Sequence, residues 1–330
     1  MPPKAIVYIL LGTFNGASFL RQQIESIQGQ SISNWRLLIR DDGSSDGTLD
    51  ILERFAISDQ RICILRSDHR RLGVTANYGE LMRAALECGA NITCFSDQDD
   101  VWLPSKLVTQ IKVLADFEAK YHRDTPILIY SDLEVVGERL QTIHHSFMKY
   151  RKISHEIQRP LQVLLVQNFV NGCGVMINRS LLELAVPVPS NVLMHDWWVS
   201  LCAAACGVIG FQPNPTVLYR QHAANVVGAK GWWPLLNPFR RDLFMRWRSG
   251  TCTLVATFEQ ACELSRRIVR AGENGIAEIA EMCNAYGSCA SLPPIKRLFE
   301  VYRLKISPQG TVRRMLFYFR LLTLSEHHRS

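Results

Sequence analysis

Along the first 135 residues, unbroken apolar runs alternate with longer segments in which apolar residues recur every three or four positions. The unbroken runs are typical of strands buried on both faces of a sheet, and the longer segments are typical of amphipathic helices. This alternation favours an α/β fold with a mostly parallel sheet and helices on both faces. Strands are predicted at 5–11, 36–40, 61–65, 92–95 and 126–131, and helices at 17–30, 45–55, 75–88 and 105–121.

Polar clusters follow three of these predicted strands, at 12–16, 41–44 and 97–100. The carboxyl ends of parallel strands meet at one edge of a sheet, which is where α/β proteins bind their ligands. A single acidic strand end is often an ordinary turn or helix cap. Because two of the three clusters carry paired carboxylates, we expect them to form one shared site.

Beyond residue 135 the pattern is less regular. It predicts helices at 156–167 and 195–206, and strands at 172–177, 207–211 and 217–219. From residue 231 onward, helical apolar stripes at 254–268 and 276–283 replace the alternation, and Pro293-Pro294 separates them from a basic and apolar remainder. We therefore expect two parts, an α/β domain over 1–230 and a helical basic C-terminal region over 231–330.

The net charge of +7 is carried by the second of these parts, because residues 231–330 contain 15 Lys/Arg and 8 Asp/Glu. Two interpretations are open. A solvated charged face is the ordinary one. The stretch 313–320, in which basic residues alternate with Met, Leu, Phe and Tyr, also suits a helix at an anionic membrane surface, and we favour this interpretation. No nucleic-acid-reading motif accompanies the charge, so we expect no nucleic acid partner.

The ten cysteines form no CxxC pair and mostly lie within apolar runs, which is typical of reduced cysteines in a core. The N-terminal residues have no signal-peptide pattern. The longest weakly polar stretch, 199–211, is shorter than the roughly 20 residues that a spanning helix needs. We expect a cytoplasmic protein, with any membrane contact peripheral, at the inner face of the plasma membrane.

The strand end at 97–100 suggests metal chemistry. Asp97 and Asp99 are two residues apart, which places their carboxylates about 7 Å apart on one face of an extended chain. Hard oxygen ligands in this arrangement suit Mg²⁺ or Mn²⁺, which can polarise a departing phosphate. The D-x-D pattern alone is a weak signal, and the Asp41-Asp42 pair at the neighbouring strand end adds weight to it.

Five motifs together resemble glycosyltransferase family 2, in order and in spacing, over about residues 4–230. They are TFNG at 13–16, DDGSSDGT at 41–48, SDQDDVWLP at 96–104, HDWW at 195–198 and YRQH at 219–222. The wording of the last three is most similar to the bacterial rhamnosyltransferase branch. The resemblance implies a GT-A fold (nucleotide-diphospho-sugar transferase, Rossmann-like) for 1–230, and an inverting, metal-dependent transfer of sugar from a nucleotide diphosphate.

The resemblance also implies roles for individual residues on the donor side. Thr13 and Asn15 would line the nucleotide pocket, Asp42 would accept the imide hydrogen of uracil or thymine, and Asp97 would face the ribose or donor sugar. Asp99 would ligate the metal, and His222 would contact the diphosphate or the metal. Asn77, on the predicted helix after Gly73, either approaches the donor or lies on the solvated helix surface.

Asp196 matches the general base of the family, although the family more often has Glu-Asp where this chain has His195-Asp196. An inverting transfer passes through an oxocarbenium-like centre and needs one base, opposite the leaving group, to deprotonate the acceptor hydroxyl. The alternative for Asp196 is a helix N-cap. Trp197 and Trp198 either stack on an acceptor sugar or belong to the core.

The residues therefore favour a transferase that moves L-rhamnose from dTDP-rhamnose to a bacterial surface polysaccharide or a lipid-linked glycan. The same chemistry with a UDP-hexose donor is the nearest alternative. A sugar nucleotidyltransferase would carry a basic, glycine-rich phosphate loop near the N-terminus, and 11–16 has no basic residue. A sugar-binding module without catalysis would not need both the metal pair and Asp196.

Overall fold

The computed structural model describes residues 6–66, 70–222, 243–271 and 276–324. Their strands form a large sheet and a small one. The large sheet consists of β10 (Val208–Gln212), β6 (Ile127–Ser131), β9 (Val175–Asn178), β4 (Ile92–Ser96), β1 (Val7–Thr13), β2 (Trp35–Asp41) and β3 (Ile62–Ile64), in that order. The small sheet consists of β5 (Val101–Trp102), β11 (Val217–Arg220), β7 (Glu134–Val136) and β8 (Thr142–His144).

The large sheet confirms the predicted mostly parallel arrangement. β1 pairs in parallel with both β2 and β4, and β10 pairs in parallel with β6. β9 runs antiparallel to its two neighbours, β4 and β6. The carboxyl ends of β1, β2, β4 and β6 and the residues that precede β9 therefore meet at one edge.

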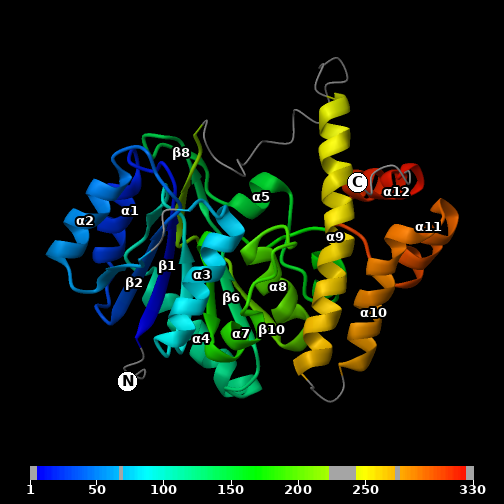
Figure 1. Cartoon of the computed structure of the whole chain (residues 1–330), viewed down its shortest axis with the longest axis horizontal. Helices are drawn as coiled ribbons and strands as arrows, with labels where there is room; N and C mark the ends of the chain where they lie inside the picture. Colours follow the sequence, from blue (N-terminus) through cyan, green and yellow to red (C-terminus); the bar gives the residue numbers. More distant parts are fainter. Residues whose placement is uncertain (1–5, 67–69, 223–242, 272–275, 325–330) are drawn as a thin grey trace.

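Helices cover both faces of this sheet, as the alternation of apolar residues requires (Figure 1). Val7, Ile9 and Leu11 of β1 pack with α1 (Leu20–Gln28), α2 (Thr48–Ser58) and α4 (Lys106–Tyr121). Tyr8 and Leu10 point to the opposite face, which is covered by α3 (Val74–Glu87), α7 (Arg179–Ala185) and α8 (His195–Cys206). β1 is thus buried on both sides, which explains its unbroken apolar sequence.

The C-terminal region is helical, as predicted, and packs beside α8 (Figure 1). It comprises α9 (Leu243–Ala271), α10 (Ala277–Ser288), α11 (Pro294–Arg303) and α12 (Thr311–Thr323). Val301 of α11 and Phe317 of α12 belong to the same apolar cluster as Leu10 of β1. The guanidinium of Arg267 lies 5.5 Å from the ring centroid of Trp198. Apolar packing therefore continues from the sheet into the C-terminal helices.

Two predicted elements differ from the structure. The helix expected over 156–167 is shorter, because α6 (Pro160–Leu164) begins at a proline, which is favourable in a first helical turn. The strand expected from 172 begins only at Val175, after a 3-10 turn at Gly172–Gly174. The pattern also missed β5, β7, β8, α5 (Phe147–Arg151) and α7, which are only two to seven residues long. Among the described helices, none is both long and apolar enough to span a bilayer.

Candidate active site

At the end of β2, the carboxylate of Asp41 accepts four hydrogen bonds. The hydroxyls of Thr13 and Ser44 donate at 2.8 and 2.6 Å, and the backbone amides of Gly43 and Ser44 donate at 3.1 and 2.7 Å. A carboxylate has about four acceptor positions, so those of Asp41 are filled by the protein. Asp41 therefore holds the turn after β2 and fixes the hydroxyl of Thr13 at the end of β1.

Asp42 is almost as fully bonded, and it is 3% exposed. The backbone amides of Leu72 and Gly73 donate to its two oxygens at 2.8 Å each. Nη1 of the buried Arg40 lies 2.9 Å away and forms an ion pair with it. Three of about four acceptor positions are occupied, so Asp42 has room for one more donor.

Asn77, on α3, is buried, so of its two predicted positions the solvated helix surface is wrong. Its side-chain oxygen accepts from Nη1 of Arg40 at 2.8 Å, and its side-chain nitrogen donates to the Arg40 carbonyl at 3.2 Å. These bonds hold Arg40, which in turn holds Asp42. Asn77 is one step removed from the loop surface.

The loop after β1 is tied to both neighbouring strand ends. Asn15 has a φ of +47°, a left-handed conformation that asparagine tolerates better than most residues. Its side-chain oxygen accepts from the Ser45 amide at 2.8 Å. From the β4 end, the side chain of Gln98 pairs with the backbone N–H and carbonyl of Phe14 at 2.9 and 3.0 Å. A Cβ on Gly16 would lie 2.3 Å from Oε1 of Gln98, so this contact requires glycine.

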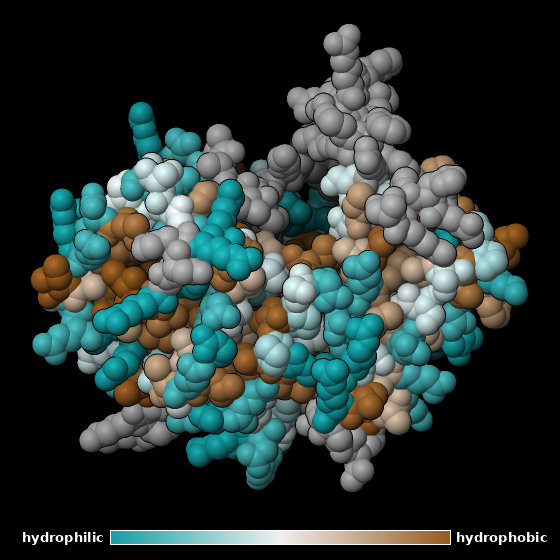
Figure 2. All heavy atoms as spheres, viewed as in Figure 1, coloured by the Kyte–Doolittle hydropathy of each residue, from teal (hydrophilic) through white to brown (hydrophobic). Residues whose placement is uncertain are grey.

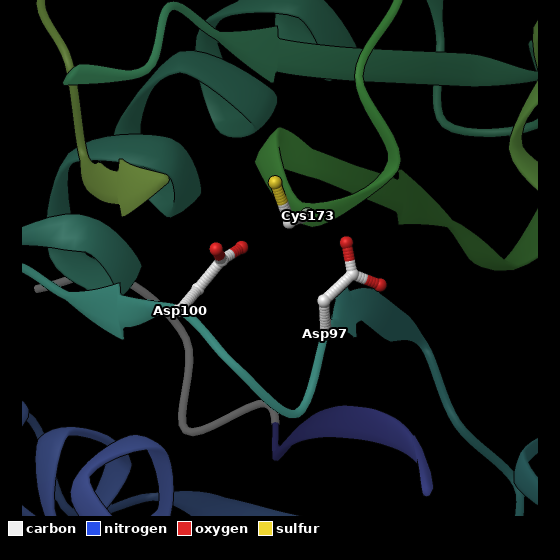
Figure 3. Close-up of side chains that lie close together, drawn as sticks. All are labelled: Asp97, Asp100 and Cys173. Carbon is white, nitrogen blue, oxygen red and sulfur yellow. The ribbon is translucent and has the colours of Figure 1, made fainter. Parts of the chain in front are cut away.

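The end of β4 gathers carboxylates that have few protein donors (Figure 3). The ligand atoms of Asp97, Asp100 and Cys173 all lie within 4.8 Å of one another. Burial, with the neighbouring charges of Asp99 and Asp196, raises the pKa of Asp97 to about 7. Asp196 lies far away in sequence, and the Gly172 amide that donates to its carboxylate brings it next to Cys173 and the β4 loop.

Asp100 is completely buried, and burial followed by the charges of Asp99 and Asp97 raises the pKa of its carboxyl well above the usual range. One oxygen accepts from the backbone amide of Arg220 at 3.1 Å. The other oxygen accepts no hydrogen bond within the described part of the chain. A buried carboxylate with an unsatisfied oxygen is costly unless a proton or a cation supplies the missing partner.

Two buried basic residues, Arg220 and Lys106, lie beside the loop at 97–100 that follows β4. Arg220 is 1% exposed, and its Nε donates to the Asp99 carbonyl at 2.7 Å. Lys106 is fully buried, and burial lowers the pKa of its amine to about 8. The Lys106 amine donates to Gln110 at 2.9 Å and lies 4.8 Å from the ring centroid of Trp102. The sequence assigned no role to either base, because burial of a lone Lys or Arg leaves no local pattern.

Asp99 and His222, the two residues for which the resemblance implies a metal role, meet in the structure. Nε2 of His222 lies 2.7 Å from a carboxylate oxygen of Asp99. The side chains of His222 and Asp99 are 10% and 17% exposed, so both remain accessible from the edge of the sheet. The ring of Phe19 packs 4.8 Å from the imidazole of His222. Residues 223–230, which continue this loop, lie outside the described residues.

Asp196 projects from the first turn of α8. The N-cap position of this helix is Met194, so the N-cap interpretation of Asp196 is wrong. The backbone amides of Gly172 and Trp197 donate to its oxygens at 3.1 and 2.6 Å. A Cβ on Gly172 would lie 3.2 Å from the Asp196 carboxylate, so glycine allows the close approach. Burial raises the pKa of Asp196 to about 6 despite these amides.

His195 lies on the inner side of Asp196 and is 4% exposed. Its imidazole stacks on the ring of Tyr78, with centroids 3.7 Å apart and an interplanar angle of 6°. The Tyr78 hydroxyl lies 2.6 Å from the Ser96 carbonyl and 3.2 Å from the Asp97 carboxylate, so these two acceptors share its one proton. Burial lowers the pKa of His195 to about 3, so the ring is neutral near pH 7. The stack joins the start of α8 to the end of β4.

The two tryptophans after Asp196 differ in their surroundings. Trp198 is fully buried, and its indole N–H donates to the Ala185 carbonyl at 2.9 Å, so it belongs to the core. Trp197 is half-buried, and its indole N–H donates to the Leu164 carbonyl at 2.6 Å. Of the two, only Trp197 offers a ring surface near the site.

The donor atoms at the β4 edge fit a hard divalent cation. Three carboxylates and one imidazole gather there, and one buried oxygen of Asp100 has no hydrogen-bond partner in the described chain. Burial keeps the pKa of the Cys173 thiol well above its usual range, so the thiol stays protonated and does not favour a soft metal. The residues therefore suit Mg²⁺ or Mn²⁺ better than zinc.

Comparison of the sequence with known proteins finds a matching family model and several similar proteins. A family model described as glycosyl transferase family 2 matches residues 8–183, more than half of the chain. The dTDP-rhamnosyl transferase RfbG of Shigella flexneri is 29% identical over 66% of this chain and 74% of that protein. A UDP-Glc:alpha-D-GlcNAc-diphosphoundecaprenol beta-1,3-glucosyltransferase, WfgD of Escherichia coli, is 27% identical over 54% of this chain and 62% of that protein. This second match covers less than two thirds of the relative.

Solved structures share the fold over nearly the whole chain. A crystal structure of S. aureus TarS 1-349 in complex with UDP aligns with a TM-score of 0.55 and 13% identity, over 98% of this chain and 91% of that chain. The mannosyltransferase PcManGT from Pyrobaculum calidifontis, in complex with GDP-Man and Mn²⁺, aligns with a TM-score of 0.50 and 15% identity. That alignment covers 98% of this chain and 81% of the other. Together these likenesses establish the GT-A fold.

Proposed function

The chain belongs to glycosyl transferase family 2, and we propose that it transfers L-rhamnose from dTDP-rhamnose to a bacterial surface polysaccharide or lipid-linked glycan, with inversion at the sugar. The choice of donor is supported by the wording of three motifs and by a relative named as a dTDP-rhamnosyl transferase. The transferase class follows from the family.

One observation carries the proposed chemistry. Asp196 comes from α8, yet it lies beside the β4 cluster, because the Gly172 amide donates to its carboxylate. The thiol of the next residue, Cys173, lies within 4.8 Å of the carboxylates of Asp97 and Asp100. Asp196 is held by its own backbone amides beside the β4 carboxylates. It can therefore face an acceptor while the β4 carboxylates face the donor diphosphate. This division of roles is what a single inverting displacement requires.

On the donor side, the nucleotide would lie along the ends of β1 and β2. Asp42 has one acceptor position left, which suits the imide N–H of a thymine or uracil ring. Thr13 and Asn15 would flank the ring and ribose, because their loop is fixed by Asp41 and Ser45. Asn77 would act through Arg40, by holding the guanidinium that pairs with Asp42.

Mg²⁺ or Mn²⁺, when bound, would offset the negative charge that develops on the leaving diphosphate. Asp99 and His222 would hold the cation, and Asp97 and Asp100 would lie beside it. Asp97 would also orient the ribose or donor sugar, with Tyr78 fixing one of its carboxylate oxygens. The buried Arg220 would keep the β4 loop in place.

Asp196 would accept the proton of the acceptor hydroxyl as that oxygen attacks the anomeric carbon. The bond from this carbon to the acceptor oxygen forms while its bond to the diphosphate oxygen breaks, and the diphosphate leaves with the electron pair. A base with a pKa of about 6 is ionised at neutral pH and still basic enough to assist. The amides of Gly172 and Trp197 would hold the carboxylate in position.

A UDP-hexose donor is the second candidate. It is supported by the relative whose name describes a UDP-Glc-dependent glucosyltransferase. Thymine differs from uracil by one methyl group, and a methyl of this kind is worth only about 1–3 kcal/mol of discrimination in an apolar pocket. The choice between the two donors therefore needs a measurement.

The test is donor hydrolysis, because water can replace an unidentified acceptor. The full chain would be incubated with dTDP-rhamnose, UDP-glucose or GDP-mannose, each with Mg²⁺, Mn²⁺ or EDTA, and the released nucleoside diphosphate quantified. We expect metal-dependent release that is fastest from dTDP-rhamnose. Faster release from UDP-glucose would replace the donor assignment, and equal release in EDTA would remove the metal from the proposal.

A further inference from the structure

Helix α11 carries apolar residues on two opposite sides. Val301 packs into the core, whereas Ile295, Phe299 and Tyr302 are 79%, 67% and 73% exposed. Their spacing of four and three residues places the three exposed side chains in one stripe along the helix. The helix therefore has a second apolar stripe that points away from the protein.

Helix α12 has the same character. Phe317 and Leu321 are buried, and the opposite side exposes an apolar stripe spaced three, four and three residues apart. Its members are Val312, Met315, Phe319 and Leu322. The sequence had suggested Phe317 for membrane contact, but this side chain lies in the protein core, because the apolar run 315–319 serves both sides of the helix.

The concentration of these residues is unusual for a protein surface. Fourteen large hydrophobic side chains are exposed in the described part of the chain, and seven of them belong to α11 and α12. Single exposed apolar residues are ordinary, whereas a cluster of them marks an interaction site. Figure 2 shows hydrophobic side chains at the outer rim of the molecule, over the end of α11.

Positive charge accompanies the two stripes. From Pro294 to Thr323 the chain contains seven Lys/Arg and one acidic residue, Glu300, which is paired with Arg303. Lys296 and Arg303 are exposed and follow directly after Ile295 and Tyr302, so they lie about 100° around the helix from the stripe. Lys305 and Arg314 are also exposed.

We propose that the exposed stripes of α11 and α12 dock this protein on an anionic lipid bilayer. Aromatic and aliphatic side chains flanked by Lys and Arg fit the boundary between acyl chains and anionic headgroups. A face that joins two copies of the chain would be expected to be poor in lysine, and it would place like charges opposite one another. The composition therefore favours lipid over a second copy.

The docking face is connected to the catalytic edge. The side chain of Gln309, just before α12, bonds the backbone N–H and carbonyl of Ser154 at 2.9 and 2.7 Å. The guanidinium of Arg313 bonds the Lys152 carbonyl at 2.7 Å. Residues 153–155 line a cavity that reaches Asp132 at the carboxyl end of β6.

The experiment is co-sedimentation of the full chain with vesicles of phosphatidylcholine alone or with one third phosphatidylglycerol. We expect binding to the anionic vesicles, reduced several-fold between 50 and 500 mM NaCl. Replacing Phe299 and Met315 together by Ser should lower the partition coefficient by roughly 10- to 100-fold, because each side chain loses its apolar burial. The matched control replaces Ile57 of α2 and Val108 of α4, which are 86% and 41% exposed away from α11 and α12, by Ser and should bind like the unaltered chain.

Binding of the Phe299→Ser, Met315→Ser variant at the level of the control would overturn the proposal. Failure of the unaltered chain to bind anionic vesicles at 50 mM NaCl would also overturn it, and a dimer that the variant dissociates in sedimentation velocity would assign the face to a second copy. Donor hydrolysis is measured on every variant. Since no altered residue belongs to the active site, loss of docking with intact hydrolysis separates this inference from the proposed function.

Discussion

The ends of β2 and β4 both present aspartates at the same edge of the sheet, but these carboxylates differ in the number of hydrogen bonds that they accept from the protein. Asp41 accepts four hydrogen bonds and Asp42 accepts three. Asp97 and Asp100 each accept one from the described residues. The number of protein donors therefore distinguishes carboxylates that are satisfied within the protein from carboxylates that have acceptor positions left for the proposed ligand.

The charged and polar groups around the carboxylates also differ between the ends of β2 and β4. Around β4, burial and then the neighbouring carboxylates raise the pKa of Asp97 to about 7. A buried cluster of this kind is costly without a proton or a cation, and under the proposed function a bound cation would offset that cost. The β2 carboxylates need no cation, because backbone amides, hydroxyls and Arg40 already surround them.

The largest effect is expected from Asp99→Asn, which removes a charge from the β4 loop but keeps the shape of the side chain. Donor hydrolysis should fall by about 10⁴-fold or more, because a bound cation contributes several kcal/mol and about 1.4 kcal/mol is a factor of ten. The melting temperature should change little. Asp116→Asn, on an exposed face of α4, is the matched control and should keep full activity.

Asp196→Asn tests the carboxylate that stands apart from both loops. The turnover rate should fall by about 10²- to 10⁴-fold, the usual contribution of a positioned base. Donor affinity, measured by calorimetry, should be unchanged, because the residue faces the acceptor. A variant that loses donor affinity but keeps its turnover rate at saturation would move Asp196 to the donor side.

The pH profile provides a smaller but independent effect. Asp196 must be ionised to accept a proton, and its pKa is raised to about 6. The rate of donor hydrolysis at low substrate should therefore rise about tenfold per pH unit below pH 6 and level off above it. In Asp196→Asn this acid limb should disappear. A limb that persists unchanged in the variant would show that another group titrates.

Asp41→Asn should have the smallest effect on catalysis and a clear effect on stability. The new amide nitrogen would face donors, leaving at least one of them unsatisfied, so the free energy of unfolding should fall by about 3 kcal/mol. Urea denaturation measures this change. Asp50→Asn, which is exposed in the first turn of α2, should cost less than about 1 kcal/mol. Equal losses in the two variants would contradict the structural role of Asp41.

The alternation of apolar runs predicted the sheet and the edge at which its polar strand ends meet, because short strands ending in polar motifs determine that geometry locally. The metal roles of Asp99 and His222, which lie together in the structure, were implied by the family resemblance and not by the strand pattern. It could not separate the β2 aspartates from the β4 aspartates, since their difference depends on donors such as Leu72 and Tyr78, which are distant in sequence. The same limit explains why the sequence left open a solvated helix surface for Asn77, which is buried and bonded to Arg40.

The C-terminal helices illustrate a second limit. The alternation of charge and aromatic residues suggested an interaction surface, but only the packed structure shows which side of α12 is free. Phe317 and Phe319 are two residues apart, and one is buried while the other is 56% exposed. Helical periodicity gives the relative angle between side chains, and the packing of α12 against α11 determines which angle faces the core.

The most direct test of the account is the shift in melting temperature that Mn²⁺ and dTDP together produce in three proteins. A ligand that binds only the folded state at about 100 times its Kd stabilises that state by about 2.7 kcal/mol. We predict an Mn²⁺-dependent shift for the unaltered chain and for Asp41→Asn, and none for Asp99→Asn. Asp41→Asn should start from a lower melting temperature and gain less from dTDP, because Asp41 fixes the hydroxyl of Thr13. If Asp99→Asn kept the Mn²⁺-dependent shift in melting temperature and Asp41→Asn lost it, the metal would depend on the carboxylates at the end of β2. That result would contradict the account.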